Sequence, residues 1–448
     1  KATVAASETY NTAIEKHLKS RLGLAFAERP DTQRGKRPVR EVIGVDPGLN
    51  DRWSTRRRSI QARRSELAGA FQADHGRPPT VIESIHLAQQ ATLETRDAKH
   101  EPRTLTEQRT AWAREAGEVL GGPHAVAAML TATLSHTVTP ASPVVDSAWV
   151  RATAATIGNT LQAARSTWQV WHVRAEAQRR VRAADLPAER VEAVVHLLVQ
   201  EVLTTGSVRI TRPQDNVHEP AELRRRDGSS MYEVAGSALF TTPAILAAEQ
   251  HLVDLAGRRD GRTASADAVA IALLEHAANG VTLNAGQAAL VTGMATSGAR
   301  VQLAIAPAGA GKTTAMRALA TAWMTDGGTV IGLAPSAAAA AVLRDQLGAG
   351  SDTLAKLTWS IEHDDLPDWA ARLGPGTLVV IDEAGMADTL SLAVVADFVT
   401  RRGGSIRLIG DDQQLAAIGA GGALRDIAAT HGAMHLTELM RRDRKSVV

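Results

Sequence analysis

A glycine-rich loop at residues 306–314, with the sequence APAGAGKTT, most constrains how this chain can fold. It lies between an apolar run, Val301–Ile305, and a segment, Thr313–Trp323, whose apolar residues recur at helical spacing. A strand, a glycine-rich turn and a helix in this order let backbone amides close around phosphate oxygens. The pattern GxxxxGK[ST] begins with glycine, whereas this chain has Ala306, a small residue that we expect still to allow the turn.

The chemistry of the loop predicts a nucleotide with magnesium. Lys312 would reach the outer phosphates of ATP and neutralise charge, and the Thr313 hydroxyl would bind Mg²⁺. The residues expected to contact the nucleotide are Gly309, Ala310, Gly311, Lys312, Thr313 and Thr314. The sequence therefore predicts an α/β fold with a parallel sheet around a phosphate-binding loop.

A second acidic motif follows a short β-branched apolar run at Thr377–Ile381. We expect Asp382, at the tip of this strand, to hold the metal's water shell, and Glu383 to orient and deprotonate the attacking water. The alternative is a solvated acidic turn. The phosphate-binding loop upstream favours the catalytic interpretation.

Two glutamines are further candidates. Gln414 follows the predicted strand Ser405–Ile409 and could sense the γ-phosphate or its attacking water through hydrogen bonds. Gln287 lies at the start of a helix capped by Asn284, where its amide could bind an adenine edge. From the residues alone, an ordinary exposed glutamine at a helix start is the favoured interpretation of Gln287.

These motifs together resemble superfamily 1 helicases of the RecD-like type, over roughly residues 281–442. The matching residues are Gln287, the AGAGKTT loop, Ala334-Pro335-Ser336, Asp382-Glu383-Ala384-Gly385, the GDDQQL block at 410–415 and the segment LTELMR at 436–441. The resemblance implies a RecA-like P-loop lobe and ATP-driven 5′ to 3′ translocation on single-stranded DNA. It also implies that Pro335, Ser336 and Thr353 contact DNA and that Arg441 reaches the γ-phosphate.

The first part of the chain resembles the end of a TrwC/TraI-type conjugative relaxase domain, as found fused to a RecD-like helicase in actinobacterial transfer proteins. The segments that carry the resemblance are ETYN at 8–11, REVIG at 40–44, WSTRR at 53–57 and QQATLETR at 89–96. Such relaxases nick DNA with a tyrosine near a metal held by three histidines. This chain has no His-x-His and only two tyrosines, so we expect Tyr10, in the helical pattern Ala5–Leu18, to be a packing residue.

Breaks in pattern predict the domain organisation. The expected regions are 1–120, the C-terminal remnant of the relaxase domain; 124–256, a helical accessory region; 257–267, a linker; 268–442, the ATPase lobe; and 443–448, a tail that is not native, because it resembles a translated sequencing adapter. The regions before the lobe are expected to be mostly helical, with a short strand at Thr80–Ile82. Strands at Val208–Thr211 and Met231–Val234 after the helices are compatible with a winged-helix module.

Composition sets broader limits. The absence of cysteine excludes thiolate catalysis and cysteine-bound zinc, and no apolar run approaches the roughly 20 residues that cross a bilayer. We therefore expect no membrane insertion and a cytoplasmic protein. Residues 1–64 contain 15 Lys and Arg against 7 Asp and Glu, a balance of +8 in a chain of net charge +2. This basic segment, which includes Arg34–Arg40, either contacts DNA phosphates or is a solvated helix face with acidic partners elsewhere.

The sequence thus predicts the ATP-binding part of a DNA helicase in a conjugative relaxase-helicase, with ATP and Mg²⁺ as cofactors. The expected partners are single-stranded DNA and other conjugation proteins of the relaxosome or coupling type. We expect the chain to begin inside the relaxase domain and to stop before a second helicase lobe, and so to bind nucleotide with little hydrolysis and no unwinding. The alternatives are a RecD-like repair helicase and an ATP-gated DNA-binding module without translocation.

Overall fold

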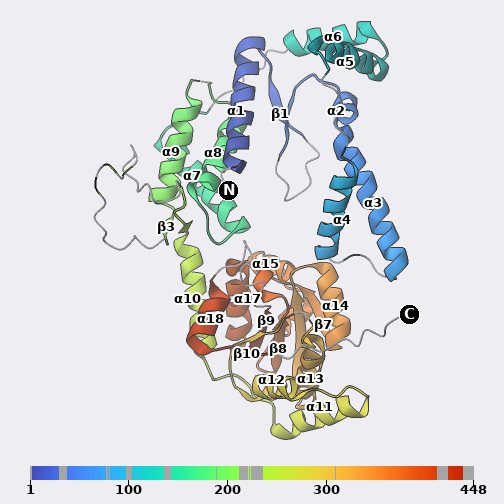
Figure 1. Ribbon diagram of the computed structural model, residues 1–448. Helices are drawn as coiled ribbons and strands as arrows, with labels where there is room; N and C mark the ends of the chain where they lie inside the picture. Colours follow the sequence, from blue (N-terminus) through green and yellow to red (C-terminus); the bar gives the residue numbers. More distant parts are fainter. Residues whose placement is uncertain are drawn as a thin grey trace. The chain divides into compact units, whose positions relative to one another are not determined.

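The chain divides into two compact units. The computed structural model describes residues 3–29, 38–76, 79, 81–96, 103–135, 143–187, 189–210, 220, 222, 224, 236–307, 309–410 and 422–436. The first unit comprises Val145–Ala177 and Val195–Val448, and the second comprises Thr3–Val144 and Gln178–Val194 (Figure 1).

A parallel sheet forms the centre of the first unit. Within the described residues it has six strands in the order β10-β5-β9-β8-β6-β7, and every neighbouring pair is parallel. The strands are β5 Val301–Ile305, β6 Thr329–Ala334, β7 Gly350–Thr353, β8 Thr377–Ile381, β9 Ser405–Gly410 and β10 Met434–His435. The predicted α/β class with a parallel P-loop sheet is confirmed.

Helices cover both faces of this sheet (Figure 1). One face packs against α11 Ala266–Ala278, α12 Ala285–Thr296, α13 Lys312–Thr325 and α14 Ala337–Leu347. The other packs against α10 Pro243–Gly257, α15 Leu354–Glu362, α16 Asp368–Ala371, α17 Thr389–Arg401 and α18 Ala423–His431. In β8, Leu378 and Val380 face the first layer, while Val379 and Ile381 face the second. A strand buried on both faces explains the continuous apolar run in the sequence.

The helix α10 belongs to the core of the lobe. Leu252 and Leu255 pack with the strands, and the coil that follows bonds to the sheet unit: Gly261 N donates to Gly298 O at 2.8 Å, and Ala264 N donates to Ala295 O at 2.9 Å. Residues expected to form a linker are therefore hydrogen bonded to the lobe. We propose that the lobe begins at Pro243 rather than at 268.

In its described residues, the rest of the first unit is helical with two short strands. Its elements are α7 Ser147–Ala164, α8 Val170–Ala183, α9 Val191–Thr204, β3 Val208–Arg209 and β4 Phe240–Thr241. The part of α8 from Gln178 and the part of α9 up to Val194 belong to the second unit. β3 pairs antiparallel with β4, and Trp168 bridges to Phe240. The predicted hairpin partner Met231–Val234 lies outside the described residues. The winged-helix identity of this region stays a prediction.

The second unit is built mainly from helices that bury few apolar side chains. Its elements are α1 Thr3–Leu22, β1 Phe26–Glu28, β2 Arg40–Val42, α2 Pro47–Trp53, α3 Thr55–His75, α4 Val81–Glu94, α5 Leu105–Leu120 and α6 Pro123–Ser135. β1 and β2 pair antiparallel. The strand expected at Thr80–Ile82 is wrong, because α4 begins at Val81. The helix penalty of two β-branched residues is a few tenths of a kcal/mol each, which a 14-residue helix outweighs.

The expectation that Tyr10 is a packing residue is also wrong. Its side chain is 65% exposed, whereas α1 buries Ala5, Thr12 and Glu15. At 100° per residue Tyr10 lies on the opposite side of the helix from these three. An aromatic residue in a helical pattern did not, in this case, mark the packed face.

Candidate nucleotide-binding site

The glycine-rich loop joins the end of β5 to the start of α13, as expected. Gly309 has φ 84° and Gly311 has φ 76°, both in the left-handed region that a side chain rarely adopts. Gly311 is the residue before Lys312, the first residue of α13. The amides at this helix start therefore present the positive end of the helix dipole to an anion. Ala308 lies outside the described residues.

The alanine at the first position of the loop has a simple explanation. Ala306 is buried, and its N–H donates to Gly410 O at 2.9 Å, which continues the pairing of β5 with β9. It is not among the described non-glycine residues with positive φ. Glycine is needed at 309 and 311 for backbone conformation, whereas position 306 requires only a small side chain.

Lys312 and Asp382 form an ion pair across the site. Lys312 Nζ lies 2.8 Å from Asp382 Oδ1, and the two side chains are 26% and 21% exposed. The backbone N–H of Asp382 donates to Leu333 O at 3.0 Å, and its Oδ1 accepts the N–H of Glu383 at 2.9 Å. The carboxylate is thus fixed at the tip of β8, within reach of the loop lysine.

Sheet register explains why residues far apart in sequence meet here. β9 lies between β5 and β8, with Ile305 paired to Gly410 and Ile381 paired to Leu408. Because the strands are parallel, their carboxyl ends share one edge of the sheet, which is where α/β proteins bind ligands. The glycine-rich loop and the pair Asp382 and Glu383 both leave from this edge.

Glu383 has a strained backbone and a perturbed side chain. Its φ of 52° is in the left-handed region, at the start of the 3-10 helix η2 Ala384–Met386. Burial raises the pKa of the Glu383 carboxyl, the charge of Asp382 raises it further, and Lys312 partly offsets both. Strain of this kind costs of order 1–3 kcal/mol and is concentrated at functional sites. A carboxyl whose pKa moves toward neutrality is suited to accept a proton.

The donor chemistry around the loop fits magnesium. Thr313 is exposed at the start of α13, and Thr314 beside it is half-buried. The Thr313 hydroxyl and the Asp382 carboxylate are hard oxygen donors, the type that Mg²⁺ prefers. These two residues would hold the ion.

Gln287 is fully buried, so the interpretation as an exposed glutamine is wrong. Its amide oxygen accepts the N–H of Asn284 at 3.0 Å, and Asn284 in turn accepts the N–H of Gln287, which completes a capping box at the start of α12. Its amide nitrogen donates to Gly311 O at 3.2 Å and to Ala310 O at 3.4 Å. The side chain therefore supports the phosphate-binding loop. The Asn-x-x-Gln spacing of a capping box was the signal available in the sequence.

The residues expected to contact DNA lie at neighbouring strand ends. Ala334 pairs with Thr353, so Pro335 and Ser336 follow β6 beside the end of β7. Ser336 caps α14 by accepting the N–H of Ala339 at 3.2 Å, and Thr353 caps α15 by accepting the N–H of Lys356 at 3.2 Å. Both hydroxyls therefore stand at helix N-termini on the same edge of the sheet as the nucleotide loop.

Sequence reasoning missed Arg407, a fully buried arginine in the central strand β9. Its guanidinium donates to Met294 O at 2.8 Å and to Ala299 O at 2.9 Å, near the C-terminal end of α12. The signal was a charged residue between the apolar residues of a buried strand. Gln414 and Arg441, the other two expected catalytic residues, lie outside the described residues.

Several basic residues of the described part of the segment 1–64 pair with carboxylates. Arg40 lies 3.1 Å from Glu15, Arg52 lies 3.7 Å from Glu118, and Arg63 lies 2.6 Å from Glu94. For these arginines the interpretation as a helix face with acidic partners is favoured. Arg34 lies outside the described residues.

Comparisons with known families agree with this geometry. Residues 282–448 match the AAA domain model, and residues 1–119 match the TrwC relaxase model. The chain therefore combines a TrwC relaxase segment with an AAA domain, a class of domain that binds nucleotides. No described helix is long and apolar enough to cross a membrane.

Part of the chain is similar in sequence to proteins named conjugal transfer protein TraA. A probable conjugal transfer protein TraA of Sinorhizobium fredii is 37% identical over 145 residues, which are 32% of this chain and 12% of the relative. The conjugal transfer protein TraA of Rhizobium radiobacter is 38% identical over 146 residues, 32% of this chain and 13% of the relative. The matched part thus spans about an eighth of these relatives. An actinobacterial source stays a prediction.

Proposed function

We propose that this chain is the ATP-binding part of a DNA helicase in a conjugative relaxase-helicase, which couples ATP hydrolysis to 5′ to 3′ translocation on single-stranded DNA during plasmid transfer. The observation that carries the proposal is the pairing of Lys312 with Asp382 at 2.8 Å beside two left-handed glycines. Such a lysine and carboxylate, beyond strand ends on one edge of a parallel sheet, are the parts that phosphoryl transfer requires.

The proposed chemistry is transfer of the γ-phosphoryl group to water. The amides of Gly309–Lys312 bind the phosphates, and Lys312 exchanges its Asp382 partner for phosphate oxygens. This exchange leaves Asp382 able to hold, with Thr313, a magnesium ion, which neutralises charge on the phosphates when bound. Glu383 accepts a proton from the attacking water as the bond to the β-phosphate oxygen breaks. Gln414 and Arg441 are proposed to sense the water and to contact the γ-phosphate.

The proposed DNA contact uses Pro335, Ser336 and Thr353. A hydroxyl that accepts a backbone N–H still has its own hydrogen to donate, so the capping roles of Ser336 and Thr353 are compatible with donation to a DNA phosphate. The N-termini of α14 and α15 favour negative charge at the same places. These contacts carry no base information and suit a motor that moves along any sequence.

The match of residues 1–119 to the relaxase model supports a role in conjugation over a role in repair. The proposed partners are accordingly single-stranded DNA and other proteins of the transfer machinery, and the proposed location is the cytoplasm. An ATP-gated DNA-binding module without translocation is the second candidate, favoured by the ion pair of Lys312 with Asp382, which must open before the lysine can contact a phosphate.

The test compares ATP hydrolysis with and without single-stranded DNA in the wild-type chain and the Glu383→Gln variant. Loss of the general base is expected to lower any hydrolysis by about 100-fold or more while ATP binding is retained. The control is Glu362→Gln, an exposed glutamate of the same lobe, which should change neither quantity. Hydrolysis that is unaffected by Glu383→Gln would contradict the proposed mechanism. Displacement of a protein block from the 3′ end but not the 5′ end of an oligonucleotide would support the proposed direction.

A further inference from the structure

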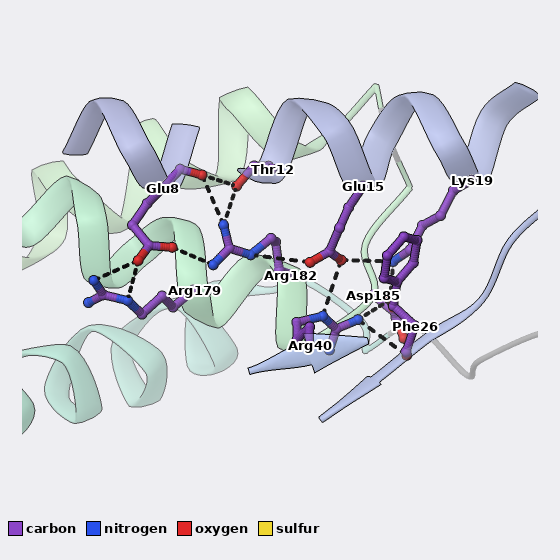
Figure 2. Close-up of polar contacts among 9 residues, drawn as sticks. All are labelled: Glu8, Thr12, Glu15, Lys19, Phe26, Arg40, Arg179, Arg182 and Asp185. Atoms are coloured by element: carbon purple, nitrogen blue, oxygen red, sulfur yellow. Dashed lines mark hydrogen bonds and ion pairs between the residues drawn. The ribbon is translucent and has the colours of Figure 1, made fainter. Parts of the chain in front are cut away.

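A network of charged side chains connects α1 to two segments that are distant in sequence (Figure 2). The residues on α1 are Glu8, Thr12, Glu15 and Lys19, whose spacing of three or four places them on one face of the helix. The residues that meet them are Arg40 on β2 and Arg179, Arg182 and Asp185 at the end of α8. All of them belong to the second unit.

At one end of the network, Glu8 lies between two arginines (Figure 2). Arg179 Nη2 lies 2.8 Å from Glu8 Oε1, and Arg182 Nη2 bonds to the other carboxylate oxygen. Arg182 Nη1 also donates to the backbone oxygen of Glu8 at 2.9 Å. The Arg182 and Glu8 side chains are 10% and 13% exposed. The guanidinium of Arg182 therefore binds both the side chain and the backbone of α1.

At the other end, Arg40 bridges two carboxylates. Its Nε donates to Glu15 at 3.1 Å, and its Nη2 donates to Asp185 at 3.1 Å. Asp185 also pairs with Lys19. One arginine of β2 thus connects α1 to the turn after α8. Arg40 is 25 residues from Glu15 and 145 residues from Asp185 in the sequence, so these contacts are not between neighbouring turns of one helix.

The backbone of Asp185 is shaped to join this network. Its φ of 49° is in the left-handed region, which costs a non-glycine residue free energy but is tolerated best by Asn and Asp. Its N–H donates to Arg182 O at 3.1 Å, which turns the chain at the end of α8. The turn brings the carboxylate to Lys19 and Arg40.

A helix face that carries Glu8 and Glu15 can be buried only where counter-charges meet it, because an unpaired buried charge is strongly unfavourable. Those counter-charges come largely from residues 178–194, which lie outside the 1–119 segment that matches the relaxase model. We propose that residues 178–194 are an integral part of the relaxase-matching unit, docked on the charged face of α1. In this proposal α1 and residues 178–194 fold and open together. A change in residues 178–194 can therefore alter the stability of α1 through this contact.

A cavity of about 550 Å³ borders the network, lined by Lys19, Asp185 and Arg182 among others. The Lys19 side chain is 29% exposed and the Arg182 side chain 10%, so solvent screens the charge of Lys19 more than that of Arg182. We therefore expect Arg182→Met to raise hydrogen exchange in α1 and in residues 178–194 more than Lys19→Met does.

The experiment is hydrogen exchange of the full chain, followed by mass spectrometry, for wild type, Glu8→Gln and Asp185→Asn. Both variants keep the shape of the side chain, and Asn tolerates the left-handed backbone at 185. Each is expected to raise exchange about tenfold or more in α1 and in 178–194 together, with peptides of the sheet unchanged. The control is Glu118→Gln, whose carboxylate is exposed on α5.

A double-mutant cycle separates a specific pair from general loss of structure. Glu8→Gln and Arg182→Met are each expected to open both segments, and the double variant is expected to open them by less than the two single effects combined, because the lost contact is shared. The proposal is overturned if Glu8→Gln opens α1 alone, if it opens neither segment, or if the effects of the two single variants add fully in the double variant. None of these variants changes the sheet or Lys312. A result that overturns the docking of residues 178–194 would therefore leave the proposed nucleotide site standing.

Discussion

The sheet lobe and the second unit are stabilised in different ways. Every residue of β8 and β9 is buried, and two apolar layers enclose the sheet. In the described part of 3–144, by contrast, the buried apolar residues are Ala5, Leu49, Ala91 and Ala116. In this part of the chain the buried residues include a charged one, Glu15, whereas the core of the lobe is mainly aliphatic.

The difference teaches which contacts a sequence can reveal. Apolar burial is not directional, so a run such as Thr377–Ile381 indicates a buried strand without naming its neighbours. An ion pair needs a particular partner at a particular distance. The pairing of Glu8 with Arg182, 174 residues apart, leaves no local pattern in the sequence.

The largest expected effect is loss of core packing in the lobe. Trp323 is fully buried, and its indole N–H donates to Gly376 O at 2.9 Å. Trp323→Ala is expected to lower the free energy of unfolding of the lobe by about 3–5 kcal/mol, with little dependence on salt. Urea unfolding measures this loss. The control Trp112→Ala, on an exposed tryptophan of α5, should cost far less, and equal losses would contradict the contrast between the units.

Acid is expected to act on the two units with opposite sign. Burial alone would raise the pKa of Glu8, but the hydrogen bond from Arg182 and the charge of Arg179 outweigh it, and the pKa lies below its ordinary value of 4.5. The stability that Glu8 contributes is therefore present above pH 4.5 and lost as pH falls through the folded pKa. The pKa of Glu383 is raised, so its contribution grows as pH falls through the folded pKa.

Hydrogen exchange corrected for intrinsic rates, measured from about pH 7 to about pH 3, separates the two trends. Glu8→Gln should remove the acid sensitivity of α1, and Glu383→Gln should remove the opposite trend near η2. A loss of protection with the same sign in both places would show that net charge, rather than these two carboxyls, controls acid stability.

Glu383→Gln is expected to raise the thermal stability of the lobe at neutral pH. Gln removes a charge that burial and Asp382 both disfavour, so a gain of about 1 kcal/mol, or a few degrees in Tm, follows. Calorimetry without nucleotide measures it. A fall in Tm would mean that the Glu383 carboxylate stabilises the fold, and would weaken its assignment as a general base.

The smallest effect is expected at an exposed ion pair of the second unit. Arg114 lies 2.6 Å from Glu118, but the two side chains are 66% and 49% exposed. Arg114→Ala should change the free energy of unfolding by less than about 0.5 kcal/mol. Thermal unfolding of this variant beside Arg182→Met tests whether burial, rather than the number of ion pairs, determines their contribution.

The sequence predicted the sheet of the lobe closely. Residues 301–305 and 377–381 are strands at the bounds expected, because a short apolar run between turns indicates a buried strand. The glycine-rich loop also agrees with expectation, since Gly309 and Gly311 adopt backbone angles that only glycine adopts readily. Lys312 and Asp382 lie close together because β5, β9 and β8 are parallel and end on the same edge of the sheet. This proximity can be expected once the order of the strands is known.

Other features depended on contacts that local patterns do not contain. The burial of Gln287 depends on the carbonyls of Ala310 and Gly311, and the exposure of Tyr10 depends on which face of α1 is charged. The strand expected at Thr80–Ile82 failed because a short β-branched run says little when a long helix follows. The docking of 178–194 became visible only with the structure.

Equilibrium binding of ATP with magnesium tests the central claim, a phosphate-binding site built on Lys312. Two variants are compared, because Lys312 and Lys356 each lie 2.8 Å from a carboxylate of the same lobe, but only Lys312 follows the glycine-rich loop. We predict a single saturable site that Lys312→Ala weakens by roughly 10- to 100-fold and that Lys356→Ala leaves unchanged. Undiminished binding by Lys312→Ala, or equal loss in both variants, would contradict the account.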